Sequence, residues 1–142
     1  MTAPASIAFL DTSVVVRYLT NNPPEAGARA AAIIDSDHRL VLSELVLVES
    51  AYVLASVYGV SRPALVDALT ALVQRRNILT PDRSKVRILE ALRMCRDSKR
   101  YSFTDVLLWA EARDRGVTRI YSFDERFPSE GIEILGKPSS AQ

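Results

Sequence analysis

The chain is poor in the residues on which several common enzyme classes depend. It has one histidine, so a ribonuclease that uses two histidines is excluded within one chain. Its single cysteine, Cys95, cannot form an intramolecular disulfide. No uncharged apolar run approaches the roughly 18 residues that a membrane span requires, and the N-terminal MTAPAS lacks the basic segment of a secretory signal. We therefore expect a cytoplasmic protein without a membrane segment.

Several active-site motifs are missing as well. The chain has no G-x-S-x-G, and His38 lies in a polar turn, which argues against a Ser-His-Asp hydrolase. It has no G-x-x-x-x-G-K-[ST] phosphate loop. A phosphatase of the haloacid dehalogenase type needs a second aspartate at the position of Ser13, and a response-regulator receiver needs an early acidic pair and a late lysine. None of these classes fits the sequence.

What remains is the composition of an ordinary globular protein. With 142 residues, 48% of them hydrophobic and 25% charged, the chain is long enough to bury its own core. It contains no repeat and no linker-like segment. We predict one domain over residues 1–142, with a core over about 7–134 and a short C-terminal tail over 135–142.

Short apolar runs alternate with longer helical patterns along the chain. This alternation predicts an α/β fold in which a single parallel sheet of four to five strands is flanked by helices. The expected strands are 7–10, 40–42, 78–80, 119–122 and a weaker one at 132–134. The expected helices are 13–19, 25–34, 44–58, 61–76, 84–96 and 104–115.

Four acidic residues stand at unusual places in this pattern. Asp11 and Asp124 each follow an apolar strand directly, Glu49 lies inside a nearly all-apolar helix, and Asp105 lies in a first helical turn. A helix N-cap and a favourable helix dipole are sufficient structural explanations for Asp11 and Asp105 taken singly. Parallel strands, however, can bring all four to one edge of the sheet, where carboxylates in low dielectric take up protons or bind a cation.

The ordered set of segments resembles the PIN-domain nucleases. The segments are FLDTSVVVRYL, SELVLVESAYVL, FTDVLLWAEA and SFDERF, and together they span about residues 7–134. Within that family the chain looks most like the VapC-type toxins of bacterial toxin–antitoxin pairs. The last segment has Ser122 where the family more often has threonine, which keeps the hydroxyl.

The resemblance implies a metal-dependent endoribonuclease. Its catalytic and metal-binding carboxylates would be Asp11, Glu49, Asp105 and Asp124, holding one or two Mg²⁺ ions, for which Mn²⁺ substitutes. Their hydrogen-bonding support would come from Thr12, Ser13 and Ser122. Glu44 also matches a frequent family glutamate, although its place in a first helical turn explains it adequately. A PIN nuclease outside any toxin–antitoxin pair and a catalytically silent PIN scaffold are the alternatives.

The resemblance also implies partners. These are a cognate antitoxin, a structured RNA such as tRNA or rRNA, and a second copy in a homodimer, with the helix from Asp105 to Arg115 as the expected interface. The antitoxin would lie in an apolar groove lined by residues 45–58 and 14–19. Residues 75–100 carry nine basic and three acidic residues, a net +6 in a chain of net +1, and could contact the RNA backbone. The candidate RNA-binding residues are Arg93, Arg96, Lys99 and Arg100.

Overall fold

Five short strands alternate with six helices in the computed structural model, which describes residues 6–136. The strands are β1 (Ile7–Phe9), β2 (Arg39–Val41), β3 (Ile78–Leu79), β4 (Arg119–Tyr121) and β5 (Glu133–Leu135). The helices are α1 (Thr12–Thr20), α2 (Pro24–Ile34), α3 (Glu44–Ser56), α4 (Arg62–Val73), α5 (Lys85–Arg96) and α6 (Phe103–Asp114). Every predicted element is present, and most boundaries agree within two residues.

Local signals explain why the helices begin where they do. Four of them start directly after a serine whose hydroxyl accepts a backbone N–H of the first turn, which satisfies a donor that has no partner inside the helix. These caps are Ser43 for α3, Ser61 for α4, Ser84 for α5 and Ser102 for α6.

All the strand pairs are parallel, as predicted, but they form two sheets instead of one. The first sheet has the order β1-β2-β3, with Ala8 opposite Leu40 and Leu40 opposite Ile78. The second contains β4 and β5, with Ile120 opposite Ile134. The α/β class and the parallel strands are therefore confirmed, whereas the single sheet is wrong, because β4 does not pair with β1 in the described part of the chain.

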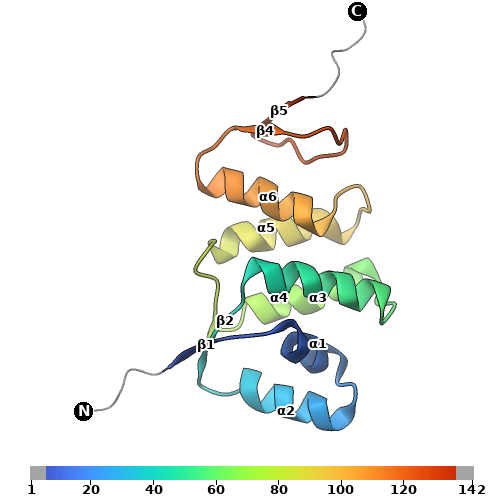
Figure 1. Ribbon diagram of the computed structural model, residues 1–142, viewed down its shortest axis with the longest axis vertical. Coiled ribbons are helices and arrows are strands. Elements are labelled where there is room, and N and C mark those ends of the chain that lie inside the picture. The colour runs from blue at the N-terminus through green and yellow to red at the C-terminus, as the bar shows by residue number, and fades with distance from the viewer. Residues whose placement is uncertain (1–5, 137–142) are drawn as a thin grey trace, which may run out of the picture.

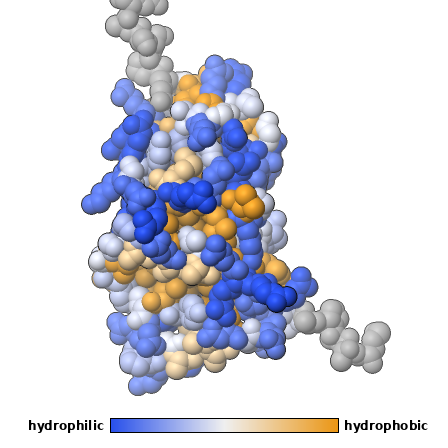
Figure 2. All heavy atoms as spheres, turned by 180° about the vertical axis from the view of Figure 1, so that it is seen from behind, coloured by the Kyte–Doolittle hydropathy of each residue, from blue (hydrophilic) through white to orange (hydrophobic). Residues whose placement is uncertain are grey.

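The helices separate the two sheets in space. In Figure 1 the chain forms successive layers, with β1 and β2 near α1 and α2 on one side of the helices α3 to α6, and with β4 and β5 beyond α6. The buried apolar residues still form one continuous cluster, which includes Ile34, Leu69, Leu92 and Trp109. Figure 2 shows that apolar side chains reach the surface across the middle of one face, between more hydrophilic ends.

The C-terminal boundary of the fold differs slightly from the prediction. Strand β5 extends through Leu135, one residue into the predicted tail, and residues 137–142 of that tail lie outside the described residues. No helix within residues 6–136 is long and apolar enough to cross a membrane.

Candidate functional site

Asp11 connects the first strand to the first helix. Backbone N–H of Leu10 still pairs with the carbonyl of Val41 at 2.9 Å, and Asp11 is the N-cap of α1. Its carboxylate accepts hydrogen bonds from the Ser13 hydroxyl at 2.6 Å and the Ser13 amide at 3.2 Å. These bonds favour the charged form and hold the pKa of Asp11 below its ordinary value. Asp11 is therefore an exposed, ionised carboxylate in a fixed orientation.

Asp124 follows β4, and its carboxylate has different hydrogen-bond partners from that of Asp11. Its backbone N–H donates to the Ser122 hydroxyl at 3.1 Å, so Ser122 fixes the turn instead of contacting the carboxylate. The carboxylate accepts the Arg126 amide at 2.8 Å and has the Arg126 side chain at 4.0 Å. Asp124 is thus exposed and tied to its own turn.

Glu49 and Asp105 lie on two neighbouring helices. Glu49 is exposed on α3 and makes no hydrogen bond or ion pair with another described residue. Asp105 is half-buried in the first turn of α6, where its amide donates to the capping hydroxyl of Ser102 at 3.0 Å. Burial raises the pKa of the Cys95 thiol on α5, and the charge of Asp105 adds to that rise.

The carboxylates do not gather into a metal site within one chain. Among residues 6–136, no group of three or more acidic, histidine or cysteine side chains is placed to hold a metal ion. The chemistry of the four predicted donors suits Mg²⁺, because all are carboxylates. Asp11 follows a strand of the first sheet and Asp124 follows a strand of the second, so the convergence of all four carboxylates at one edge stays a prediction.

Two buried hydroxyls stand beside the predicted carboxylates in the sequence. Thr12 Oγ1 and Ser50 Oγ, next to Asp11 and Glu49, are buried and have no hydrogen-bond partner among the described residues. Thr12 therefore does not provide the hydrogen bond that the sequence suggested. Buried polar groups are normally paired, so both hydroxyls are unusual features of the α1 and α3 region.

A cleft of about 1010 Å³ opens between α3 and α6. Glu49 and Thr104 line it together with the apolar side chains of Leu45, Tyr52 and Leu108. The cleft thus contains the α3 part of the expected groove but is completed by α6, whereas Val14 of α1, expected to line the same groove, lines a separate hollow against α2.

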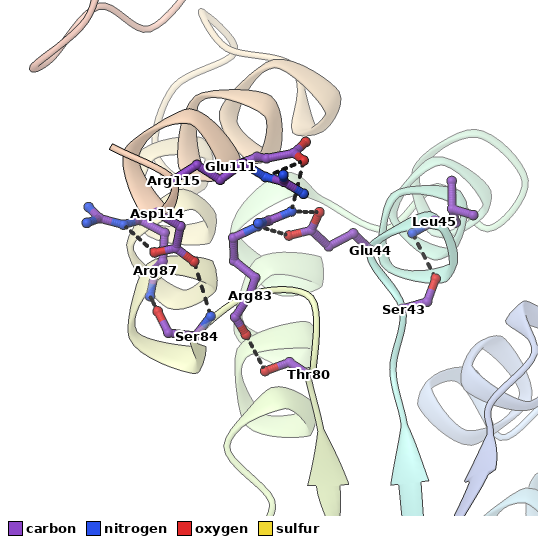
Figure 3. Close-up of polar contacts among 10 residues, drawn as sticks. All are labelled: Ser43, Glu44, Leu45, Thr80, Arg83, Ser84, Arg87, Glu111, Asp114 and Arg115. Carbon is purple, nitrogen blue, oxygen red and sulfur yellow. Dashed lines mark hydrogen bonds and ion pairs between the residues drawn. The ribbon is translucent and has the colours of Figure 1, made fainter. Parts of the chain in front are cut away.

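Arg83 closes one side of this cleft and was not singled out from the sequence. Its guanidinium is buried and pairs with both carboxylate oxygens of Glu44, at 2.7 and 2.9 Å, and lies 3.7 Å from Glu111 (Figure 3). The pair explains Glu44 more fully than its place in a first turn. Because Glu44 is on α3 and Glu111 on α6, Arg83 joins the two helices across the cleft.

The predicted RNA-binding residues differ in whether a neighbouring acidic side chain neutralises their charge. Arg96 makes a bidentate ion pair with Asp67, at 2.7 and 2.9 Å, and contacts Asp97 at 2.8 Å. Arg93 and Lys99 are exposed and have no acidic partner among the described residues, and Arg100 lies over the ring of Tyr101. Arg93, Lys99 and Arg100 are therefore better placed than Arg96 to bind phosphate.

Comparison with known proteins agrees with the motifs and the fold. The family model of the PIN domain matches residues 8–130, a range that includes all four predicted carboxylates. No curated protein and no solved structure matches the chain. Since the family match covers most of the sequence and the parallel α/β architecture is consistent with it, the chain belongs to the PIN domain family.

Proposed function

We propose that this protein is a Mg²⁺-dependent endoribonuclease and the VapC-type toxin of a toxin–antitoxin pair, hydrolysing RNA phosphodiester bonds in the cytoplasm and thereby inhibiting translation. PIN domains are typically nucleases. The observation that carries the proposal is the family match over residues 8–130 together with carboxylates at the four expected motif positions. Mg²⁺ is the expected metal and Mn²⁺ its substitute, because the proposed ligands are all hard oxygen donors.

A cleavage assay with matched acidic variants tests this function. We expect the purified protein to cut RNA with Mg²⁺ or Mn²⁺ and to be inactive with excess EDTA. Asp11→Asn should reduce cleavage by at least about 100-fold, the scale on which one charge-stabilising group acts, while circular dichroism stays unchanged. Asp37→Asn, which alters an exposed acid in the turn before β2, is the control and should retain full activity. Cleavage that persists in EDTA or in Asp11→Asn contradicts the proposal.

RNA binding can be tested with the free basic residues. Arg93→Glu should weaken binding of RNA and reduce the slope of log affinity against log salt by about one, since each phosphate contact releases about one counterion. The matched control is Arg96→Glu, which changes the charge by the same amount at a residue that Asp67 already neutralises, and its effect should be smaller. Equal salt slopes for wild type and Arg93→Glu would place the RNA surface elsewhere.

The toxin role is supported by the cleft between α3 and α6. Its exposed Leu45, Tyr52 and Leu108 offer an apolar surface of the kind that an amphipathic helix of an antitoxin binds. Overproduction of the chain should stop growth, and co-expression with the adjacent small open reading frame should restore growth and yield a complex. A nuclease without growth arrest and without such a partner supports the alternative of a PIN nuclease outside a toxin–antitoxin pair. A stable PIN fold that cleaves no RNA supports the silent scaffold.

A further inference from the structure

The carboxylate of Asp105 is not held by any side chain of the described residues. It makes no hydrogen bond or ion pair with them, whereas the carboxylate of Asp11 accepts two bonds from Ser13. Only the amide of Asp105 is bonded, to the hydroxyl of Ser102, which caps α6. The position of the Asp105 carboxylate therefore depends on how firmly the first turn of α6 is held.

An arginine from another helix holds the loop in front of that turn. Arg62 is the first residue of α4, and its Nη1 donates to the carbonyl of Tyr101 at 2.7 Å. The same atom lies 3.4 Å from the carbonyls of Cys95 and Ser98, one at the end of α5 and one in the loop after it. The guanidinium also lies over the ring of Phe103, 5.1 Å from its centroid. Arg62 thus contacts the end of α5, the α5–α6 loop and the first residue of α6.

The loop has few other ties at this point. The last carbonyls of a helix have no partner inside it, and at Asp97, where α5 ends, no backbone N–H caps the helix. The only other side-chain donor to the Tyr101 carbonyl among the described residues is the thiol of Cys95, a weak donor at 4.0 Å. Removal of the guanidinium therefore leaves this carbonyl, one residue before the Ser102 cap, without a strong partner.

The surroundings of Arg62 suit a residue that fixes the main chain. Its side chain is half-buried and forms no ion pair with an acidic residue of the described chain, in contrast to Arg83 and Arg96. All its hydrogen bonds go to backbone carbonyls between residues 95 and 101. Bonds from a charged donor are stronger than those between neutral groups, so one guanidinium can hold several carbonyls in place. Helix α5, whose end it binds, packs against both α4 and α6 (Figure 1).

We propose that Arg62 is a positioning residue of the nuclease site. It fixes the α5–α6 loop and the first turn of α6, and thereby sets the position of the Asp105 carboxylate for metal binding. Arg62 acts through Asp105 and does not itself contact the metal ion or the RNA. The catalytic meaning of this role rests on the proposed function, whereas the ordering of the turn rests on the contacts of Arg62 alone.

Metal titration tests the effect on Asp105. Arg62→Met keeps the length of the side chain but removes its charge and its donors, and it should weaken Mn²⁺ binding in titration calorimetry by about 10- to 100-fold, the usual effect of losing a residue that orients metal ligands. Saturating Mn²⁺ should restore cleavage of RNA, and Arg62→Lys, which keeps a charged donor, should lose less affinity. The control, Leu65→Val, perturbs a buried residue one turn further along α4 and should leave Mn²⁺ affinity unchanged.

Hydrogen exchange tests the ordering of the turn without metal or RNA. In Arg62→Met, the amides of Asp105 and Val106, which bond to the hydroxyl and the carbonyl of Ser102, should exchange about 10-fold faster than in the wild type. Amides of α3 should keep their rates. The slope of log affinity for RNA against log salt, measured without metal, should not change. A slope reduced by about one would mean that Arg62 contacts a phosphate, which overturns the positioning role.

The remaining outcomes separate this inference from the nuclease proposal. If Arg62→Met keeps the Mn²⁺ affinity of an active wild type, the inference is wrong and the nuclease proposal stands, whether or not exchange in the turn becomes faster. If the wild type binds no Mn²⁺ and cuts no RNA, the proposed function is removed. The exchange rates alone then decide whether Arg62 orders the first turn of α6, and unchanged rates overturn that part as well.

Discussion

The first sheet is built into the core, whereas the second rests on a single helix. Leu40, Val41 and Ile78 of β2 and β3 are buried between layers of helices. The second sheet is anchored to α6 by Trp109. Phe127 and Ile132, from the segment that connects β4 to β5, are buried in the same apolar cluster. Both sheets nevertheless leave one outer strand largely exposed, β1 in the first sheet and β4 in the second. The same local pattern, an apolar strand followed by an aspartate, can thus lie in very different surroundings, and burial of the neighbouring strands makes the difference.

The largest expected effect comes from removing the anchor of the second sheet. Trp109→Ala should lower the free energy of unfolding by about 3–5 kcal/mol, because it leaves a large cavity and frees the Glu130 carbonyl. Urea denaturation measures the loss, and hydrogen exchange should show it first in β4 and β5. Leu108→Ala, one residue earlier and exposed, is the control, with an expected loss below about 1 kcal/mol. Equal losses would mean that Trp109 does not anchor the sheet.

A smaller effect is expected at the ion pairs through which Arg83 connects α3 to α6. Glu44→Gln leaves the buried Arg83 guanidinium with only the more distant Glu111, and we expect a loss of about 2–3 kcal/mol. The double variant Glu44→Gln/Arg83→Met should lose less than Glu44→Gln alone, because no unpaired charge then remains buried. Thermal unfolding of the two single variants and the double variant gives the coupling energy. A coupling near zero would mean that the ion pair does not join α3 to the loop before α5.

The smallest effect concerns Cys95, which is buried between the two regions. Burial raises the pKa of its thiol from 9.0 to about 11. Because the unfolded chain loses this proton first, stability is full below pH 9 and decreases as the pH rises toward 11, by about 1–2 kcal/mol. Urea denaturation between pH 8 and 11 should show this loss in the wild type and a flatter profile in Cys95→Ala. Parallel profiles would show that the thiol does not titrate as described.

The sequence predicted the local structure well because local signals determine it. Serine caps, glycine ends and apolar periodicity are readable within a few residues, and the helices start where Ser43, Ser61 and Ser84 predict. The N-cap explanation of Asp11 and its bond to Ser13 follow from the same short-range chemistry. Arg83 was missed because its partners, Glu44 and Glu111, are far away in the sequence and a basic run gives no sign of which member is buried.

The sequence by itself determined the elements and the parallel α/β class, and it predicts the four family carboxylates. Only the tertiary structure decided which strands meet. Strands β1 and β4 have three residues each, and strand edges pair through backbone N–H and C=O groups that are alike at every position, so the side chains of such short strands do not specify the partner strand. The packing of Trp109 on the β4–β5 unit and the turn at Gly116 direct β4 away from β1, which separates Asp124 from Asp11 within a single chain.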